Sequence, residues 1–158
     1  MAQGEELGGK GKEAAAEVIE NNIRKKVVEK ILINPKYYEK MSAILDELIK
    51  ARREGAIAYE KLLEKYIELV KNSESPENNP HYPESIRYSG ALRALYDNCG
   101  EDEALAIALD KAVCESRQAD FRHNEFKERR IKQALLKVLN DKNEVERVYN
   151  IVVEQGEY

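Results

Sequence analysis

Apolar residues recur every three or four positions through most of the chain, a spacing that places them on one face of an α-helix. The first stripe predicts a helix over residues 13–32, which ends before Pro35 because the residue preceding a proline disfavours helical geometry. Further helices are predicted over residues 35–53 and 57–71. The first of these two is expected to be capped by Asn34 and to end at Arg52, Arg53 and Gly55, because cations suit the C-terminal end of a helix and glycine adopts the left-handed conformation. The predicted inward-facing residues are Ala15, Val18, Ile19, Ile23, Val27 and Ile31 in the first helix, Tyr37, Tyr38, Met41, Leu45, Leu48 and Ile49 in the second, and Tyr59, Leu62, Leu63, Tyr66, Ile67 and Val70 in the third.

The second half of the chain predicts shorter helices. Ser89 and Asp102 are suited to begin two of them, because their side-chain oxygens can accept hydrogen bonds from the free N–H groups of a first turn. Another helix is predicted over residues 124–140. The last segment has helical spacing in spite of its β-branched residues. No segment alternates over the length of a strand, so we predict an all-α fold.

The predicted division of the chain depends on one loop. Residues 72–83 contain three prolines and several turn-forming residues, which exclude regular secondary structure. The loop divides a helical domain of residues 13–158 into halves of residues 13–71 and 84–155. Residues 1–12 are polar and rich in glycine, which predicts a flexible lead-in. The predicted fold is an irregular bundle of about seven helices in two halves joined by a Pro-rich loop.

Composition and charge narrow the class of protein. The 158 residues include 26 basic and 30 acidic side chains, so a formal net charge of −4 limits any DNA contact to a local patch. No apolar run approaches the roughly 18 residues needed to span a bilayer. The first residues lack the apolar core of a secretory signal, and two cysteines do not make a disulfide framework. We expect a cytoplasmic protein without membrane contact.

Few residues of this chain are candidates for catalysis or metal binding. Two histidines and two cysteines could bind zinc, but their spacing matches no zinc motif, and the simpler interpretation is two buried thiols and two surface imidazoles. No phosphate-binding glycine motif occurs. We therefore expect no catalytic, cofactor-binding or metal-binding residues in this chain. The two histidines are His81 and His123, and the two cysteines are Cys99 and Cys114.

An acidic cluster leaves a second interpretation open. Glu101, Asp102 and Glu103 stand where a helix is predicted to begin, and anions there offset the helix dipole. The same carboxylates, with a histidine, could serve a metal-dependent hydrolase. This enzyme hypothesis is kept beside the interpretation of the cluster as a helix start.

Cations gather in the helix predicted over residues 124–140. At about 100° per residue, Lys127, Arg130 and Lys137 fall within roughly 80° on one face. With Arg122 they are the candidate contacts to a protein partner or to phosphate groups. The alternative is a solvated face with pairs of opposite charge. A helical nucleic-acid-contacting module is therefore another hypothesis.

Several short blocks resemble the C-terminal helical region of the R subunit of type I restriction enzymes. The resemblance covers most of the chain from about Glu13 onward, and the blocks fall in the expected order. In the last block, Phe121 and His123 stand where the family usually has Trp and Gly. The blocks are Asn34-Pro35-Lys36-Tyr37-Tyr38-Glu39-Lys40-Met41-Ser42, Leu45-Asp46-Glu47-Leu48-Ile49, Arg52-Arg53, Tyr59-Glu60-Lys61-Leu62-Leu63, Tyr82-Pro83-Glu84-Ser85-Ile86, Ala94-Leu95-Tyr96-Asp97-Asn98 and Asp120-Phe121-Arg122-His123-Asn124.

The resemblance implies a role in assembly. The parent R subunit is an ATP- and Mg²⁺-dependent DNA translocase and a type I site-specific deoxyribonuclease. Its motor and nuclease domains precede this region, and it assembles with modification (methyltransferase) and specificity subunits. In the family, the C-terminal helical part is thought to hold the motor against the methyltransferase core. The resemblance thus implies that this chain docks to that core and meets DNA only through the parent complex.

Overall fold

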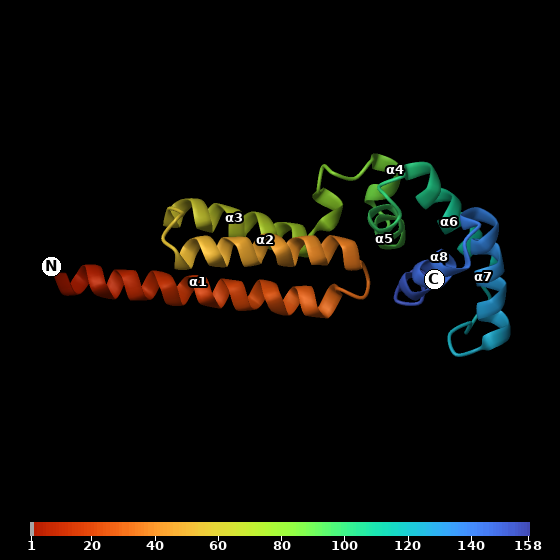
Figure 1. Cartoon of the computed structure of the whole chain (residues 1–158), viewed down its shortest axis with the longest axis horizontal. Coiled ribbons are helices and arrows are strands. Elements are labelled where there is room, and N and C mark those ends of the chain that lie inside the picture. The colour runs from red at the N-terminus through yellow and green to blue at the C-terminus, as the bar shows by residue number, and fades with distance from the viewer. Residues whose placement is uncertain (1) are drawn as a thin grey trace. The chain divides into compact units, whose positions relative to one another are not determined.

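The computed structural model describes residues 2–158, with side chains from Lys10 onward. Within these residues it contains eight α-helices, one short 3-10 helix and no strand (Figure 1), so the predicted all-α fold is confirmed. No helix in the described part of the chain is long and apolar enough to cross a membrane. The elements are α1 (Ala2–Lys30), α2 (Pro35–Arg53), α3 (Tyr59–Glu74), η1 (Pro76–Asn78), α4 (Glu84–Arg87), α5 (Gly90–Asn98), α6 (Glu103–Ser116), α7 (Glu125–Leu139) and α8 (Lys142–Val152).

Two predicted segments differ from the structure. The side chains of residues 1–9, which make up most of the expected lead-in, lie outside the described part of the chain, and residues 10–12 belong to α1. The loop predicted over residues 72–83 contains the end of α3 and the 3-10 helix η1. Proline is tolerated in a first helical turn, which explains why Pro76 can begin η1.

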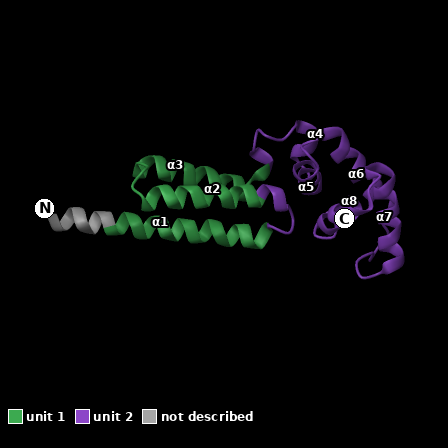
Figure 2. Ribbon diagram, viewed as in Figure 1, with its two compact units in different colours: residues 1–30, 38–76 green, residues 31–37, 77–158 purple. Residues whose placement is uncertain are grey.

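The chain divides into two compact units, coloured separately in Figure 2. Unit 1 comprises residues 1–30 and 38–76, and unit 2 comprises residues 31–37 and 77–158. The sequence pattern placed residues 31–37 in the first half, because they lie between two long helices. In the structure their contacts are to residues of unit 2, which include Asp97 and Asn98.

Unit 1 is built from α1, the greater part of α2, and α3. A short turn joins α2 and α3 (Figure 1). Gly55 in this turn has a φ of 64°, the left-handed conformation predicted for the end of a helix. The predicted inward faces of α2 and α3 are largely confirmed, except that Ile67 is exposed. The buried apolar residues of the unit are Ala16, Ile23, Val27, Tyr38, Met41, Leu45, Leu48, Leu62, Tyr66 and Leu69.

The buried face of α1 agrees with the prediction at Ile23 and Val27 and differs from it nearer the start of the helix. Ala15 and Val18 were expected to face inward but are exposed, whereas Ala16 is fully buried. The reason is Glu20, a charged residue that lies on the buried face because α2 and α3 supply partners for it. A pattern of apolar residues gives no sign of a buried charge, so it assigned Ala15 and Val18 to the buried face in place of Ala16 and Glu20.

Unit 2 contains α4 to α8 around one apolar core. The predicted helix starts at Ser89 and Asp102 are confirmed, because their side chains accept hydrogen bonds from Leu92 N (3.1 Å) and Leu105 N (3.0 Å). The last segment is helix α8, as its spacing predicted. The core residues are Tyr82, Ile86, Leu95, Tyr96, Ala106, Leu109, Val113, Phe121, Ile131, Leu135, Val145, Val148, Tyr149 and Val152.

Candidate functional site

The most concentrated group of polar side chains in unit 2 surrounds Asp97, which is buried in the last turn of α5. Its Oδ2 accepts hydrogen bonds from Asn34 Nδ2 (2.8 Å) and from the hydroxyl of Tyr82. Its Oδ1 lies 2.9 Å from Nε2 of His81, which donates to it. Three donors thus satisfy a carboxylate that would otherwise be costly to bury. We call Asn34, His81, Tyr82, Asp97 and Asn98 the Asp97 cluster.

Asn34 connects the Asp97 cluster to the start of α2. Its Oδ1 accepts a hydrogen bond from Tyr37 N (3.3 Å), which confirms the predicted helix cap. The same oxygen accepts a hydrogen bond from Asn98 Nδ2 at 2.8 Å. Asn98 Oδ1 in turn accepts from Lys36 N at 3.2 Å. A residue predicted as a local cap therefore also joins the beginning of α2 to the end of α5.

Aromatic rings surround the buried carboxylate. The ring centroid of His81 lies 4.8 Å from that of Tyr82 and 5.4 Å from that of Tyr96. Burial and the hydrogen bond to Asp97 raise the pKa of Tyr82. The Tyr82 hydroxyl consequently stays protonated and remains a donor to Asp97.

The geometry of the Asp97 cluster fastens three segments that are distant in the sequence. A carboxylate beside an imidazole also occurs in hydrolases, where it orients the imidazole toward a nucleophile. Among the described residues, no serine or cysteine forms a hydrogen bond with the His81 ring. Both carboxylate oxygens are already occupied by side chains of unit 2. The arrangement is therefore suited to holding segments together.

A second buried carboxylate, Glu20, lies in unit 1. It accepts two hydrogen bonds from the guanidinium of Arg52 and one from the hydroxyl of Tyr66. Burial by itself would raise the pKa of Glu20, but these hydrogen bonds and the charges of Arg52 and Arg53 lower it overall. From the sequence, Arg52 is expected to interact with the negative C-terminal end of α2. In the structure, its guanidinium instead neutralises the buried carboxylate of Glu20.

The structure places the four predicted cations in different surroundings. The guanidinium of Arg122 donates to the carbonyl oxygens of Val153 (2.8 Å), Gln155 (2.7 Å) and Tyr158 (3.2 Å). Arg122 thus holds the segment that follows α8. Lys127 Nζ donates to Ala119 O at 2.5 Å. These two cations are engaged within unit 2.

Arg130 and Lys137 are the two predicted cations that remain exposed on α7. Neither forms an ion pair with any residue that the structure describes. They line one hollow together with Lys111 of α6, which the sequence pattern did not single out. We therefore narrow the candidate partner contacts to Arg130 and Lys137 and add Lys111.

Of the histidines and the acidic cluster, the fold brings His81 and Glu101 together, with Nε2 of His81 3.7 Å from Oε1 of Glu101. Within the described part of the chain, no three His, Cys, Asp or Glu side chains are grouped closely enough to hold a metal ion. The predicted burial of both thiols is wrong, because Cys99 is half-buried and Cys114 is exposed. Asp102 accepts the first-turn hydrogen bond of α6, as the interpretation of a helix start predicts. Of the two histidines, His81 has a structural role, in the Asp97 cluster.

Comparison of the chain with protein-family models, curated proteins and solved structures found no match. The site residues that sequence reasoning missed are Glu20 and Asp97. The one available signal was their position, since each stands beside residues of an apolar stripe: Glu20 follows Ala16 and precedes Ile23 at helical spacing, and Asp97 follows Leu95-Tyr96. A charge at such a position indicates a buried partner elsewhere in the fold.

Proposed function

We propose that this chain is the C-terminal assembly domain of a type I restriction enzyme R subunit and that it docks to the methyltransferase core. The observation that carries the proposal concerns the blocks that resemble that family. Asn34, Tyr82 and Asp97 come from three separate blocks, yet the side chains of Asn34 and Tyr82 both donate to Asp97 in the Asp97 cluster. Short blocks that agreed by chance would have no reason to converge on one buried group.

The block of residues 120–124 supports the same proposal, even at the two positions where its residues differ from those usual in the family. Phe121, where the family usually has Trp, is 2% exposed and lies in the core of unit 2. His123, where the family usually has Gly, has a φ of 64°. Glycine adopts this left-handed conformation without steric cost. The backbone geometry at residue 123 is therefore that expected for a position that usually carries glycine.

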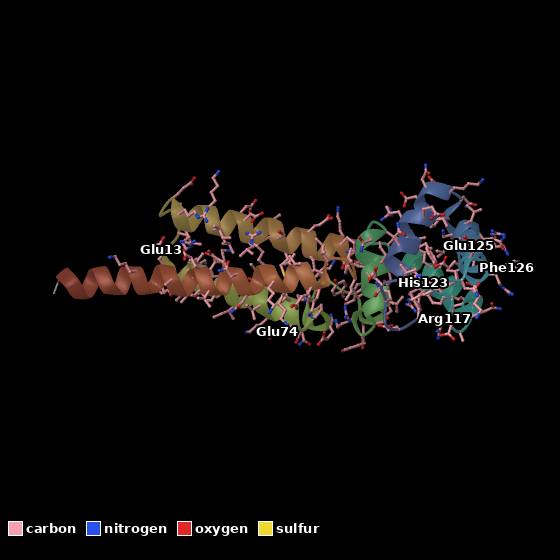
Figure 3. The ribbon with its side chains drawn as sticks, turned by 90° about the horizontal axis from the view of Figure 1, so that it is seen from below. Glu13, Glu74, Arg117, His123, Glu125 and Phe126 are labelled. Carbon is pink, nitrogen blue, oxygen red and sulfur yellow. The ribbon has the colours of Figure 1, made fainter. Side chains whose placement is uncertain are left out.

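The residues of these blocks act mainly inside the fold, so a docking role would rest on exposed side chains. Large apolar side chains remain on the surface of both units, including Val28 of α1, Tyr88 and Phe126. Phe126 is 78% exposed and is labelled at the start of α7 in Figure 3. Aromatic and apolar side chains of this kind are enriched where proteins bind one another. Rigid helices that present them are suited to a protein partner.

A nucleic-acid-contacting module that uses Lys127, Arg130 and Lys137 is the second candidate. It is favoured by the absence of ion pairs at Arg130 and Lys137 among the described residues. It is disfavoured by the engagement of Lys127 with Ala119 and by the formal net charge of −4, which repels a polyanion at long range. Binding of a DNA duplex that weakens steeply with salt would support this candidate.

The proposed function is tested by mixing the purified chain with the methyltransferase core, assembled from the modification and specificity subunits of the proposed parent enzyme. We expect a complex by sedimentation velocity, and competition by the chain when the full R subunit binds the same core. The matched control is an unrelated helical protein of similar size and net charge. No association and no competition at roughly tens of micromolar would contradict the proposal.

A further inference from the structure

A hollow of about 590 Å³ lies between α6 and α7 in unit 2. Both helices contribute to it, and all of its lining residues belong to unit 2, so its shape is set within one compact unit. The lining residues are Ala108, Lys111, Ala112, Glu115, Ser116, Arg130, Gln133, Ala134, Lys137 and Val138.

The rim of this hollow is basic, although the chain as a whole is acidic. Lys111, Arg130 and Lys137 face a single carboxylate, Glu115. Lys111 lies 3.8 Å from Glu115, and both side chains are about 70% exposed, so this pair contributes little. Arg130 and Lys137 have no ion-pair partner in the described part of the chain. The rim therefore offers uncompensated positive charge.

The floor of the hollow is made of short side chains. Ala108 and Ala112 lie one turn apart on α6, and Ala134 lies opposite them on α7. All three are half-buried. Their methyl groups let another backbone approach closely, and Val138 adds apolar surface at one end. The site thus combines an apolar floor with charged edges.

We propose that the groove between α6 and α7 binds an acidic amphipathic helix of a partner protein. Such a helix places an apolar stripe on the alanine floor while its carboxylates meet Lys111, Arg130 and Lys137. A DNA backbone would use the cations but leave the apolar floor without a partner. A second copy of this chain in a symmetric dimer would bring the same basic rim to the contact. The inference names a surface and its chemistry, and it does not depend on the methyltransferase being the partner.

The experiment uses the full chain and a synthetic amphipathic peptide of about 20 residues, with Glu along its polar face and Leu and Ala on the other. The comparison probe is the same peptide with Lys in place of every Glu. Amide chemical-shift changes are followed by NMR as each peptide is added. We expect the acidic peptide to perturb residues of α6 and α7 around the groove, and the basic peptide to leave them unchanged.

Charge reversal then locates the site. The double variant R130E/K137E should bind the acidic peptide about tenfold more weakly or worse, because two attractive contacts become repulsive. The matched control K40E/K65E changes the net charge by the same amount on exposed positions of unit 1, and its affinity should change less than about twofold. Circular dichroism checks that both variants remain folded.

Four results would overturn the inference. These are an acidic peptide that does not bind, equal weakening in both double variants, shift changes away from α6 and α7, and a preference for the basic peptide. A DNA duplex of about 20 base pairs that binds the groove more tightly than the acidic peptide would assign the surface to nucleic acid instead. Self-association that is lost in R130E/K137E would assign it to a second copy.

Discussion

The guanidinium of Arg52 binds the carboxylate of Glu20 through two hydrogen bonds, from Nε to Oε2 at 2.7 Å and from Nη2 to Oε1 at 2.8 Å. Both side chains are at least nine-tenths buried, and the Tyr66 hydroxyl donates to the same carboxylate. This contact joins all three helices of unit 1 through a single charge. Exposed pairs such as Arg24–Asp46 lack this shielding from water and contribute much less.

The first prediction concerns the effect of low pH on the stability of unit 1. Because the folded-state pKa of Glu20 is lowered, its ionised form stabilises the fold, and this contribution is complete above the unfolded-state pKa. It is lost as the pH falls through the folded-state value, so stability should decline from about pH 5 downward. E20Q should lose about 2–3 kcal/mol of unfolding free energy at neutral pH and show a flatter decline in acid. Urea unfolding at several pH values measures both.

The matched control is E17Q, which removes an exposed carboxylate from the same helix. Its free energy of unfolding should change by less than about 0.5 kcal/mol at neutral pH. If E20Q and E17Q have the same acid profile, Glu20 does not carry the pH dependence of unit 1.

The second prediction ranks three variants of the Asp97 cluster. D97A leaves the donors of Asn34, Tyr82 and His81 without an acceptor and should cost about 3 kcal/mol. Y82F removes one buried donor and should cost about 1–2 kcal/mol. H81A should cost less than Y82F, because the His81 side chain is 28% exposed and water can replace it.

Hydrogen exchange measured by segment is the suitable observable, since two compact units need not unfold together. Exchange should accelerate in unit 2 and change little in α1 and α3. An effect of H81A larger than that of D97A would show that His81, and not the carboxylate, organises the cluster.

The third prediction concerns the segment that follows α8. In R122A, the carbonyls of Val153, Gln155 and Tyr158 lose their shared donor, so amide exchange over residues 153–158 should rise at least about tenfold. R122K should not restore protection, because an ammonium group lacks the planar fork that reaches several acceptors.

R129A is the matched control for R122A. Arg129 is exposed, and its guanidinium lies 5.9 Å from the centroid of the exposed ring of Phe126. The exchange of residues 153–158 should be the same in R129A as in the unchanged protein. Equal exchange in R122A and R129A would mean that Arg122 does not hold this segment.

The sequence predicted those parts of the fold that depend on local rules. The caps at Asn34, Ser89 and Asp102 and the turn at Gly55 follow from the chemistry of one residue and its neighbours in the chain. The helical spacing of apolar residues gave most of the core positions in α2 and the helical state of α8. Each of these features is decided within a few residues.

The buried polar contacts were missed because they depend on residues far away in the chain. Glu20 is separated from Arg52 by 32 positions, and Asn34 from Asp97 by 63. A hydrophobic pattern assigns a charge to the outside unless its partner is known. The prediction that Ala15 and Val18 of α1 face inward was wrong for this reason. The internal use of Arg122 was missed because its acceptors are backbone carbonyls more than 30 positions away.

The last prediction tests the conformation at residue 123. His123 has a φ of 64°, and its exposed side chain, labelled in Figure 3, forms no hydrogen bond with other described residues. H123G should raise the unfolding free energy of unit 2 by about 0.5 kcal/mol, because relief of left-handed strain outweighs the greater entropy of glycine in the unfolded chain. H123A keeps the Cβ atom and should give no gain, which separates backbone strain from loss of the imidazole. Urea unfolding of the three proteins measures the difference, and a gain in H123A equal to that in H123G would assign the effect to the side chain instead of the backbone.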